Sequence, residues 1–159
     1  MEATIEFRPA VAEDVDAIER LQRDAIRHGT GDHYEADAID AWAGAFNRDG
    51  FAGKVEKAEV WIAEEEGRTV GYASLDPATF EVDSVYVAPE AAGRGIGRAL
   101  VEHILEVARE HRLENVWLDA SQNSVPFYER LGFVVTGEDG SRTRGGVTIR
   151  CTRMARLIR

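Results

Sequence analysis

Cysteine, lysine and long apolar runs are scarce or absent in this sequence. Its 159 residues include one cysteine and two lysines, and no apolar run reaches the roughly 18 residues that a membrane-spanning helix needs. A single cysteine excludes an internal disulfide and is typical of a reducing compartment. The amino-terminal residues carry no cationic stretch followed by a hydrophobic one, so no secretory signal is expected. We therefore expect a cytoplasmic protein with no membrane as a partner.

Several kinds of catalytic site are also missing. No group of histidine, cysteine and acidic residues has the spacing of a metal site, so no metal is expected. No serine, histidine and aspartate can be assigned to a catalytic triad from their positions. Cys151 could act as a nucleophile, but it lies in the strand-like segment 147–152, and we favour a buried structural thiol.

The charge balance is acidic, with a formal net charge of −10. Such a surface disfavours nucleic acid and suits a cationic substrate, although the acidity can also serve solubility alone. The carboxyl-terminal segment 142–159 is the exception, since it is rich in arginine and has no acid. It could close over an anionic cofactor or alternate along an exposed strand, and we favour the strand.

Alternating apolar residues predict strands, and apolar residues three and four positions apart predict helices. The expected strands are 3–8, 59–65, 69–75, 82–87, 115–120, 133–136 and 147–154, and the expected helices are 14–26, 36–46, a long helix from 96 and a short one at 126–131. Glycines at 50 and 53 are expected to end the second helix, and 138–146 to be a polar loop.

The order of these elements predicts the fold class. A strand, a helix and a strand between 82 and 120 imply a right-handed parallel crossover. We predict one domain, residues 1–159, of the α/β class (α+β type). Its sheet has about seven strands, is mixed and mostly antiparallel with a central parallel pair, and is flanked by about four helices.

A glycine-rich loop lies between the strand at 82–87 and the long helix. Gly93, Gly95 and Gly97 alternate with Arg94 and Ile96, and Arg98 follows. Glycines let the backbone approach a ligand, and the free amides of a helix's first turn attract a phosphate or diphosphate. The alternative is a tight turn whose glycines serve packing only. A Walker-type loop is excluded by the missing Gly-Lys-Ser/Thr, and a dinucleotide fingerprint by Arg98 at its sixth position.

Two segments, VYVAPEAAGRGIGRALVEHILEVA and SQNSVPFYERLGF, resemble the GCN5-related N-acetyltransferase (GNAT) superfamily. Its loop motif, (Gln/Arg)-x-x-Gly-x-(Gly/Ala), corresponds here to residues 92–97, with Ala92 at the first position. The resemblance implies that acetyl-CoA is the co-substrate and binds in a cleft between the strands at 82–87 and 115–120. It assigns cofactor binding to Val85, Tyr86, Val87, Gly93, Arg94, Gly95, Ile96, Gly97 and Arg98, with Ser121 and Asn123 as further polar contacts.

The resemblance also suggests catalytic residues. Tyr128 matches the tyrosine that can give a proton to the departing thiolate, and its alternative is a packed tyrosine bonded to a backbone carbonyl. Glu81 matches a base by register from the loop, and Asp83 projects from the same face of the strand. The alternative for both is a solvated or salt-bridged carboxylate, and no dedicated base at all is a further alternative.

The acceptor is expected to be a primary amine of a small molecule, protein or peptide. His33 and Tyr34 could line its pocket, or equally form the start of a helix with Tyr34 as an apolar anchor. The expected activity is direct transfer of acetyl from acetyl-CoA to that amine. Alternatives are a larger acyl-CoA, a non-catalytic acyl-CoA sensor, or nucleotide binding without CoA. Such folds often form homodimers, and no motif here requires one.

Overall fold

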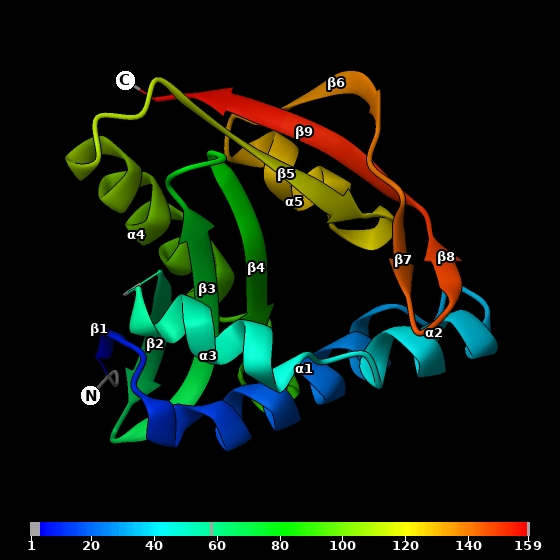
Figure 1. Ribbon diagram of the computed structural model, residues 1–159, viewed down its shortest axis with the longest axis horizontal. Helices are drawn as coiled ribbons and strands as arrows, with labels where there is room; N and C mark the ends of the chain where they lie inside the picture. The colour runs from blue at the N-terminus through cyan, green and yellow to red at the C-terminus, as the bar shows by residue number, and fades with distance from the viewer. Residues whose placement is uncertain (1–3, 58, 159) are drawn as a thin grey trace.

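The computed structural model describes residues 4–57 and 59–158, and its centre is a seven-stranded sheet in the order β1-β2-β3-β4-β5-β9-β6 (Figure 1). The strands of this sheet are β1 (Ile5–Pro9), β2 (Val60–Glu65), β3 (Arg68–Asp76), β4 (Glu81–Val87), β5 (Asn115–Ser121), β6 (Val134–Asp139) and β9 (Cys151–Leu157). A separate hairpin consists of β7 (Arg142–Arg144) and β8 (Val147–Ile149). The α-helices are α1 (Val15–Gly29), α2 (Ala36–Ala43), α3 (Arg48–Glu56), α4 (Ile96–Glu110) and α5 (Val125–Arg130).

Helices cover both faces of this sheet. Consecutive residues of a strand point to opposite faces, and β3 shows where each helix lies. A Cβ on Gly71 would point at Leu100 of α4, whereas the next residue, Tyr72, hydrogen-bonds Gln22 of α1 and packs edge-on against Phe51 of α3. The long helix therefore covers one face, and α1 and α3 cover the other.

The central parallel pair, β4 and β5, is joined at one end only. Within the described residues the two strands share a single register pair, Glu81 with Trp117, and the amide of Trp117 donates to the carbonyl of Phe80 at 3.0 Å. Beyond that point they diverge (Figure 1). The predicted fold class, including this parallel pair, is confirmed.

One helix was not expected. The prediction that glycines at 50 and 53 end the second helix is wrong, because α2 ends at Ala43 and residues 48–56 form α3. The side chain of Asn47 accepts a hydrogen bond from the amide of Gly50 at 3.0 Å and so caps the new helix. Packing of Phe51 into the core, where it is 6% exposed, offsets the poor helix propensity of the glycines.

The carboxyl-terminal region also differs from the prediction. The expected loop at 138–146 contains the end of β6 and the strand β7, and the expected strand at 147–154 is divided into β8 and β9. Gly145 and Gly146 have φ of 55° and 80°, which allows the tight turn between β7 and β8. Part of the first expected strand, Ala3, lies outside the described residues.

His103 of α4 packs against aromatic side chains of the outer strands. Its ring stacks on Phe7 at 4.6 Å and lies edge-on to Trp61 at 4.5 Å. Burial lowers the pKa of His103. This imidazole therefore belongs to the packing between α4 and the outer strands.

No α-helix within the described residues combines the length and hydropathy needed to traverse a bilayer.

A second, smaller core fixes the β7–β8 hairpin. Ile149 of β8 is 1% exposed and packs with Ile26 of α1 and with Trp42 and Ala43 of α2. On the same side, a Cβ on Gly145 would lie 3.0 Å from the carbonyl oxygen of Ala41. The buried apolar contacts of the hairpin are therefore with α1 and α2.

The close approach of α4 to β3 predicts a cost for any side chain at position 71. A Cβ there would lie 2.8 Å from Leu100 Cδ1 and 3.0 Å from the backbone oxygen of Tyr86. We expect Gly71→Ala to lower the free energy of unfolding by about 1–3 kcal/mol, as overpacking does. The matched control is Gly53→Ala in α3, where a Cβ meets nothing within 4 Å. This control should raise stability by about 0.5–1 kcal/mol in urea denaturation. Equal effects of the two substitutions would contradict the packing argument.

Candidate active site

A cleft of about 230 Å³ opens where β4 and β5 part. Its walls are residues 81–87 of β4 and 118–121 of β5, and it is closed by residues of α1, α2, α5 and the β7–β8 hairpin. A second hollow of about 440 Å³ lies at the glycine-rich loop and the start of α4. Val87 lines both, so the two hollows adjoin at the end of β4.

The start of α4 is open. Gly95 is its N-cap with φ of 81°, and Gly93 has φ of 78°, conformations that favour glycine. The first helical hydrogen bond runs from the amide of Ala99 to the carbonyl of Gly95 at 3.0 Å. Among the described residues no side chain caps the helix, and no group accepts from the amides of Ile96, Gly97 and Arg98. These amides can therefore bind an anion.

The two arginines of the loop have carboxylate partners on the surface. Arg94 forms an ion pair with Glu65, and Arg98 pairs with Glu102 at 2.9 Å, one helical turn further on. The Arg98–Glu102 pair is largely solvent-exposed and contributes little to stability, whereas in the other pair Arg94 is exposed and Glu65 is mostly buried. A bound anion would compete with Glu65 and Glu102 for these guanidinium groups.

Val85, Tyr86 and Val87 line the cleft. On one edge they pair with Ala73, Tyr72 and Gly71 of β3. On the other edge β4 has no ladder partner after Glu81 within the described residues. The backbone groups of this edge are therefore available to an extended ligand that carries amides.

Tyr128 of α5 lies in the cleft with its side chain almost buried. The residue is 8% exposed, and its ring packs edge-on against Phe127 and Phe133. In the part of the chain that the structure describes, nothing hydrogen-bonds its hydroxyl, so the alternative of a bond to a backbone carbonyl is not found. Burial raises the pKa of Tyr128 well above its usual range. The phenol therefore stays protonated at neutral pH and can act as a proton donor.

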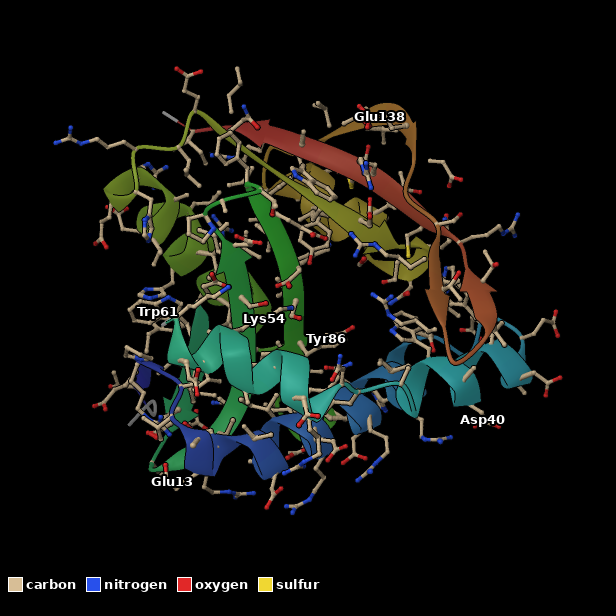
Figure 2. The ribbon with its side chains drawn as sticks, viewed as in Figure 1. Glu13, Asp40, Lys54, Trp61, Tyr86 and Glu138 are labelled. Atoms are coloured by element: carbon tan, nitrogen blue, oxygen red, sulfur yellow. The ribbon has the colours of Figure 1, made fainter. Side chains whose placement is uncertain are left out.

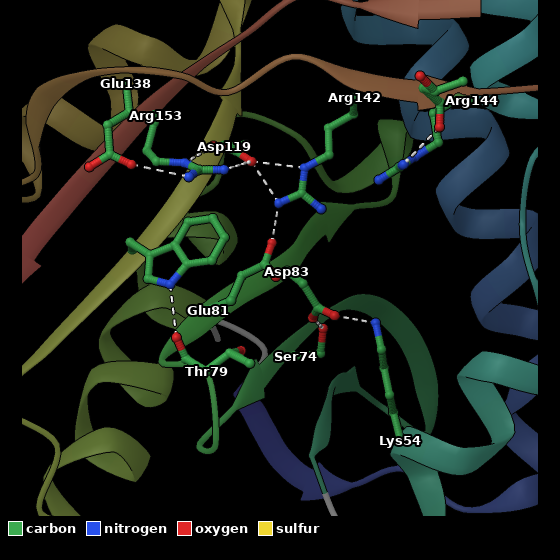
Figure 3. Close-up of polar contacts among 12 residues, drawn as sticks. Lys54, Ser74, Thr79, Glu81, Asp83, Asp119, Glu138, Arg142, Arg144 and Arg153 are labelled. Carbon is green, nitrogen blue, oxygen red and sulfur yellow. Dashed lines mark hydrogen bonds and ion pairs between the residues drawn. The ribbon is translucent and has the colours of Figure 1, made fainter. Parts of the chain in front are cut away.

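Glu81 and Asp83, the two candidate bases, both line the cleft and both have cationic partners (Figure 3). Glu81 forms an ion pair with Arg142 of β7. Asp83 is bonded by Lys54 of α3 and by the hydroxyl of Ser74. The salt-bridged arrangement that the sequence left open is therefore present for both.

A third carboxylate of the cleft, Asp119 of β5, is buried and joins this network. Its side chain is 3% exposed and accepts hydrogen bonds from Arg142 Nε at 2.8 Å and from Arg153 Nε at 2.8 Å. Burial alone would raise the pKa of Asp119, but the hydrogen bonds from Arg153 and Arg142 outweigh it, and the pKa is lowered. The Arg153 guanidinium also lies over the Trp117 ring, 4.2 Å from its centroid.

The arginines at 142, 144 and 153 are thus not side chains of a simply exposed strand. All three are partly buried, and Arg142 and Arg144 line the cleft. Arg142 and Arg144 are two residues apart, and in a strand this spacing places both side chains on the same face. This was the signal in the sequence that could have brought them together. That Arg142 and Arg153 share Asp119 as a partner could not be predicted, because Asp119 lies in another strand.

Ser121 and Asn123 also reach the cleft. The hydroxyl of Ser121 lies 2.9 Å from that of Ser124, and Oδ1 of Asn123 is buried without a hydrogen-bond partner among the described residues. An unpaired buried acceptor is costly unless a ligand supplies a donor. This is consistent with a polar ligand in the cleft.

His33 and Tyr34 are not among the residues that line the cleft. His33 is exposed on the turn between α1 and α2. The hydroxyl of Tyr34 donates to the carbonyl of Arg150 at 2.5 Å and accepts from the amide of Gln122 at 2.9 Å. Its ring packs edge-on against Trp42. Tyr34 is therefore the anchor that the sequence offered as the alternative.

Cys151 is partly buried and lines the cleft, and burial raises the pKa of its thiol. A raised pKa keeps the thiol protonated and argues against a nucleophile.

The described residues contain no group of three or more His, Cys, Asp and Glu side chains that could hold a metal ion.

Comparison with known proteins gives one consistent family. A family profile described as "Acetyltransferase (GNAT) domain" matches residues 30–156. Streptothricin acetyltransferase of Streptomyces lavendulae is 27% identical over 90% of this chain and 88% of its own length. Glucosamine 6-phosphate N-acetyltransferase of Trypanosoma brucei brucei is 38% identical over 91 residues, which span 52% of this chain and 60% of that enzyme.

Two solved structures are similar along nearly the whole chain. A GCN5-related N-acetyltransferase from Rhodopseudomonas palustris superposes with a TM-score of 0.89 at 27% identity, covering 99% of this chain and 98% of that one. YncA from Salmonella typhimurium, a putative acetyltransferase solved with acetyl-CoA, has a TM-score of 0.69 at 25% identity, covering 100% and 95%.

The network around Asp119 predicts a pH-dependent contribution to stability. Asp119→Asn removes the charge that two guanidinium groups share, and we expect a loss of about 1–3 kcal/mol in the free energy of unfolding at pH 7. Because the folded-state pKa of Asp119 is lowered, its contribution is present above about pH 4 and is lost as the pH falls through that pKa.

The difference between wild type and Asp119→Asn in urea denaturation should therefore shrink in acid. The control is Glu138→Gln on the outer strand β6, whose 3.3 Å bond to Arg153 is at an exposed position (Figure 2). This control should change stability by less than about 0.5 kcal/mol. A pH-independent difference for Asp119→Asn would show that the carboxylate does not gain from its partners.

Proposed function

The chain belongs to the acetyltransferase (GNAT) family and is an acetyl-CoA-dependent N-acetyltransferase, and we propose that it transfers acetyl directly to a primary amine in the cleft between β4 and β5. The observation that carries this proposal is the junction of two features at Val87. The uncapped start of α4 lies on one side, and the unpaired edge of β4 lies on the other. A ligand with a diphosphate at one end and amides along its length matches both.

The residues present fit coenzyme A. The amides of Ile96, Gly97 and Arg98 would hold its diphosphate, since they have no partner in the described residues. Arg94 and Arg98 would add charge-assisted contacts on release from their surface carboxylates. The free edge of β4 at Val85 and Val87 would hold the amide-bearing arm, and Asn123 offers an unpaired acceptor nearby.

Tyr128 is the proposed acid. When bound, acetyl-CoA supplies an acetyl group as a thioester, and transfer to an amine forms a C–N bond as the C–S bond breaks. The amine must lose a proton, and the sulfur must gain one. The hydroxyl of Tyr128 holds its proton at neutral pH and has no competing partner in the described residues, which supports its giving that proton to the sulfur.

Glu81 and Asp83 remain the candidates to accept the amine proton, through water. Glu81 shares Arg142 with Asp119, whereas Asp83 is engaged by both Lys54 and Ser74. Glu81 therefore has the more adaptable surroundings, since Arg142 keeps a second carboxylate if Glu81 turns toward water. We favour Glu81 for this reason.

The acceptor is proposed to be a small molecule or a peptide amine. Relatives named for their acceptors include the glucosamine 6-phosphate and streptothricin enzymes and a peptidyl-lysine N-acetyltransferase, YjaB of Escherichia coli. Their diversity supports an amine acceptor and leaves its identity to the shape and charge of this chain's own cleft.

The role of Tyr128 predicts a change in turnover without a change in binding. We expect Tyr128→Phe to lower kcat at least tenfold, which corresponds to about 1.4 kcal/mol or more of barrier. CoA affinity in calorimetry should persist, because only the hydroxyl is removed. Glu81→Gln run in parallel should lower kcat and reduce its dependence on pH if Glu81 is the base. Unchanged turnover in Tyr128→Phe would remove the residue from the mechanism.

The open loop predicts that a side chain at position 95 abolishes CoA binding. We expect Gly95→Glu to lose measurable binding, because bulk and negative charge would fill the anion site. The matched control is Gly137→Glu, which has φ of 88° and, like Gly95, no atom within 4 Å of an added Cβ. It carries the same backbone strain and charge but lies in β6. Wild-type CoA binding by folded Gly95→Glu would contradict the assignment.

A further inference from the structure

The charges of the cleft do not match a cationic acceptor. Its three carboxylates, Glu81, Asp83 and Asp119, each contact a cationic side chain. Two of them share Arg142, and Asp119 has Arg153 in addition. Little negative charge is therefore left for an acceptor to neutralise, although the sequence had suggested a cationic one.

One cation of the cleft, Arg144, has no carboxylate partner among the residues that the structure describes. Arg142 and Arg144 lie two apart on β7 and both line the cleft. The guanidinium of Arg142 binds two carboxylates, but that of Arg144 makes one hydrogen bond, from Nη1 to the carbonyl of Thr143 at 3.1 Å. Within the described part of the chain no acidic group pairs with Arg144, and Figure 3 shows it standing apart from the network.

Two titratable groups near Arg144 are neutral. Its charge is felt by Tyr86 of β4 and by Cys151 of β9. Burial raises the pKa of Tyr86 to about 12 and also raises that of the Cys151 thiol, so neither supplies a negative charge at neutral pH. A partly buried guanidinium facing neutral groups is a strong binder of carboxylate or phosphate oxygens.

The position of Arg144 is fixed by its hairpin. Gly145 lies against Ala41 of α2, and Ile149 is buried with Trp42. Arg144 lines the cleft together with Tyr128, but it does not line the hollow at the start of α4. It is therefore placed toward the acceptor's end of the site and away from the diphosphate.

We propose that Arg144 binds an anionic oxygen group of the acceptor, so that the preferred amine carries a carboxylate or a phosphate. This inference rests on the proposed function, because it concerns the acceptor of the same cleft. It assigns acceptor selection to a residue of the β7–β8 hairpin.

The test uses pairs of amines that differ in the acid. Glycine with glycinamide and L-phenylalanine with its amide test a carboxylate, and O-phosphoethanolamine with ethanolamine tests a phosphate. We would measure kcat/KM for wild type, Arg144→Gln, Arg144→Lys and Arg150→Gln. Arg150 is the matched control, since it is exposed on the adjacent segment and does not line the cleft. Comparing ratios between variants cancels differences in amine reactivity.

Wild type should prefer the anionic member in one of the two sets by about tenfold or more. Arg144→Gln should lose this preference, mainly through KM, while Arg144→Lys keeps part of it and Arg150→Gln keeps all of it. Binding of the same compounds to the CoA-saturated enzyme, measured by calorimetry, gives the preference independently of turnover.

An unchanged ratio in Arg144→Gln, a wild-type preference for the neutral members, or no binding by any anionic compound would overturn the inference. Equal acetylation of both members of each pair would do so while leaving the proposed function intact. Arg144-dependent binding without any acetylation would instead sink the proposed function and leave the role of Arg144 standing.

Discussion

The separation of β4 from β5 is the constraint on which the site depends. A sheet gains stability from a continuous ladder, and buried backbone groups that lack partners are costly. Here the ladder between the two central strands stops after one register pair, Glu81 with Trp117. The fold thereby leaves the edge of β4 free next to the open start of α4. A bound substrate can form hydrogen bonds with the backbone groups there that have no partner in the described residues.

Beyond the single register pair, ion pairs connect β4 and β5. Arg142 contacts Glu81 on β4 and Asp119 on β5, so one guanidinium joins the two strands across the divide. Arg153 holds Asp119 from β9 and covers Trp117. Replacing a ladder by buried charges is a costly way to join strands, because each charge loses water. Its benefit is that the strands stay at a fixed separation while the cleft stays open.

Local sequence predicted the parts of the structure that depend on local contacts. The strand, glycine-rich loop and long helix at 82–110 could be read from periodicity and glycine spacing, and the parallel pair followed from their order. The helix α3 was missed, because its stability comes from the Asn47 cap and from burial of Phe51, which outweigh two glycines. The β7–β8 hairpin was missed for a similar reason, since it is held by α1 and α2 rather than by strong strand propensity of its own.

For the site, too, the sequence predicted only the features that depend on local motifs. Motif residues such as Tyr128 and Val87 do line the cleft, and the free amides at the start of α4 follow from the loop. The partners of Glu81, Asp83 and Asp119 could not be foreseen, since each comes from a segment distant in sequence. Likewise, Tyr34 could not be assigned between pocket and anchor without knowing that Gln122 and Arg150 lie beside it.

The hydroxyl of Tyr34 couples two walls of the site mechanically. It bonds at once to the loop that follows β5, at Gln122, and to the junction between β8 and β9, at Arg150. The first segment leads into Asn123 and Tyr128, and the second continues the hairpin that carries Arg144. Neither wall can shift far without stretching a bond to the same oxygen atom. A shift of either wall would therefore act on the hydrogen bond that holds the other.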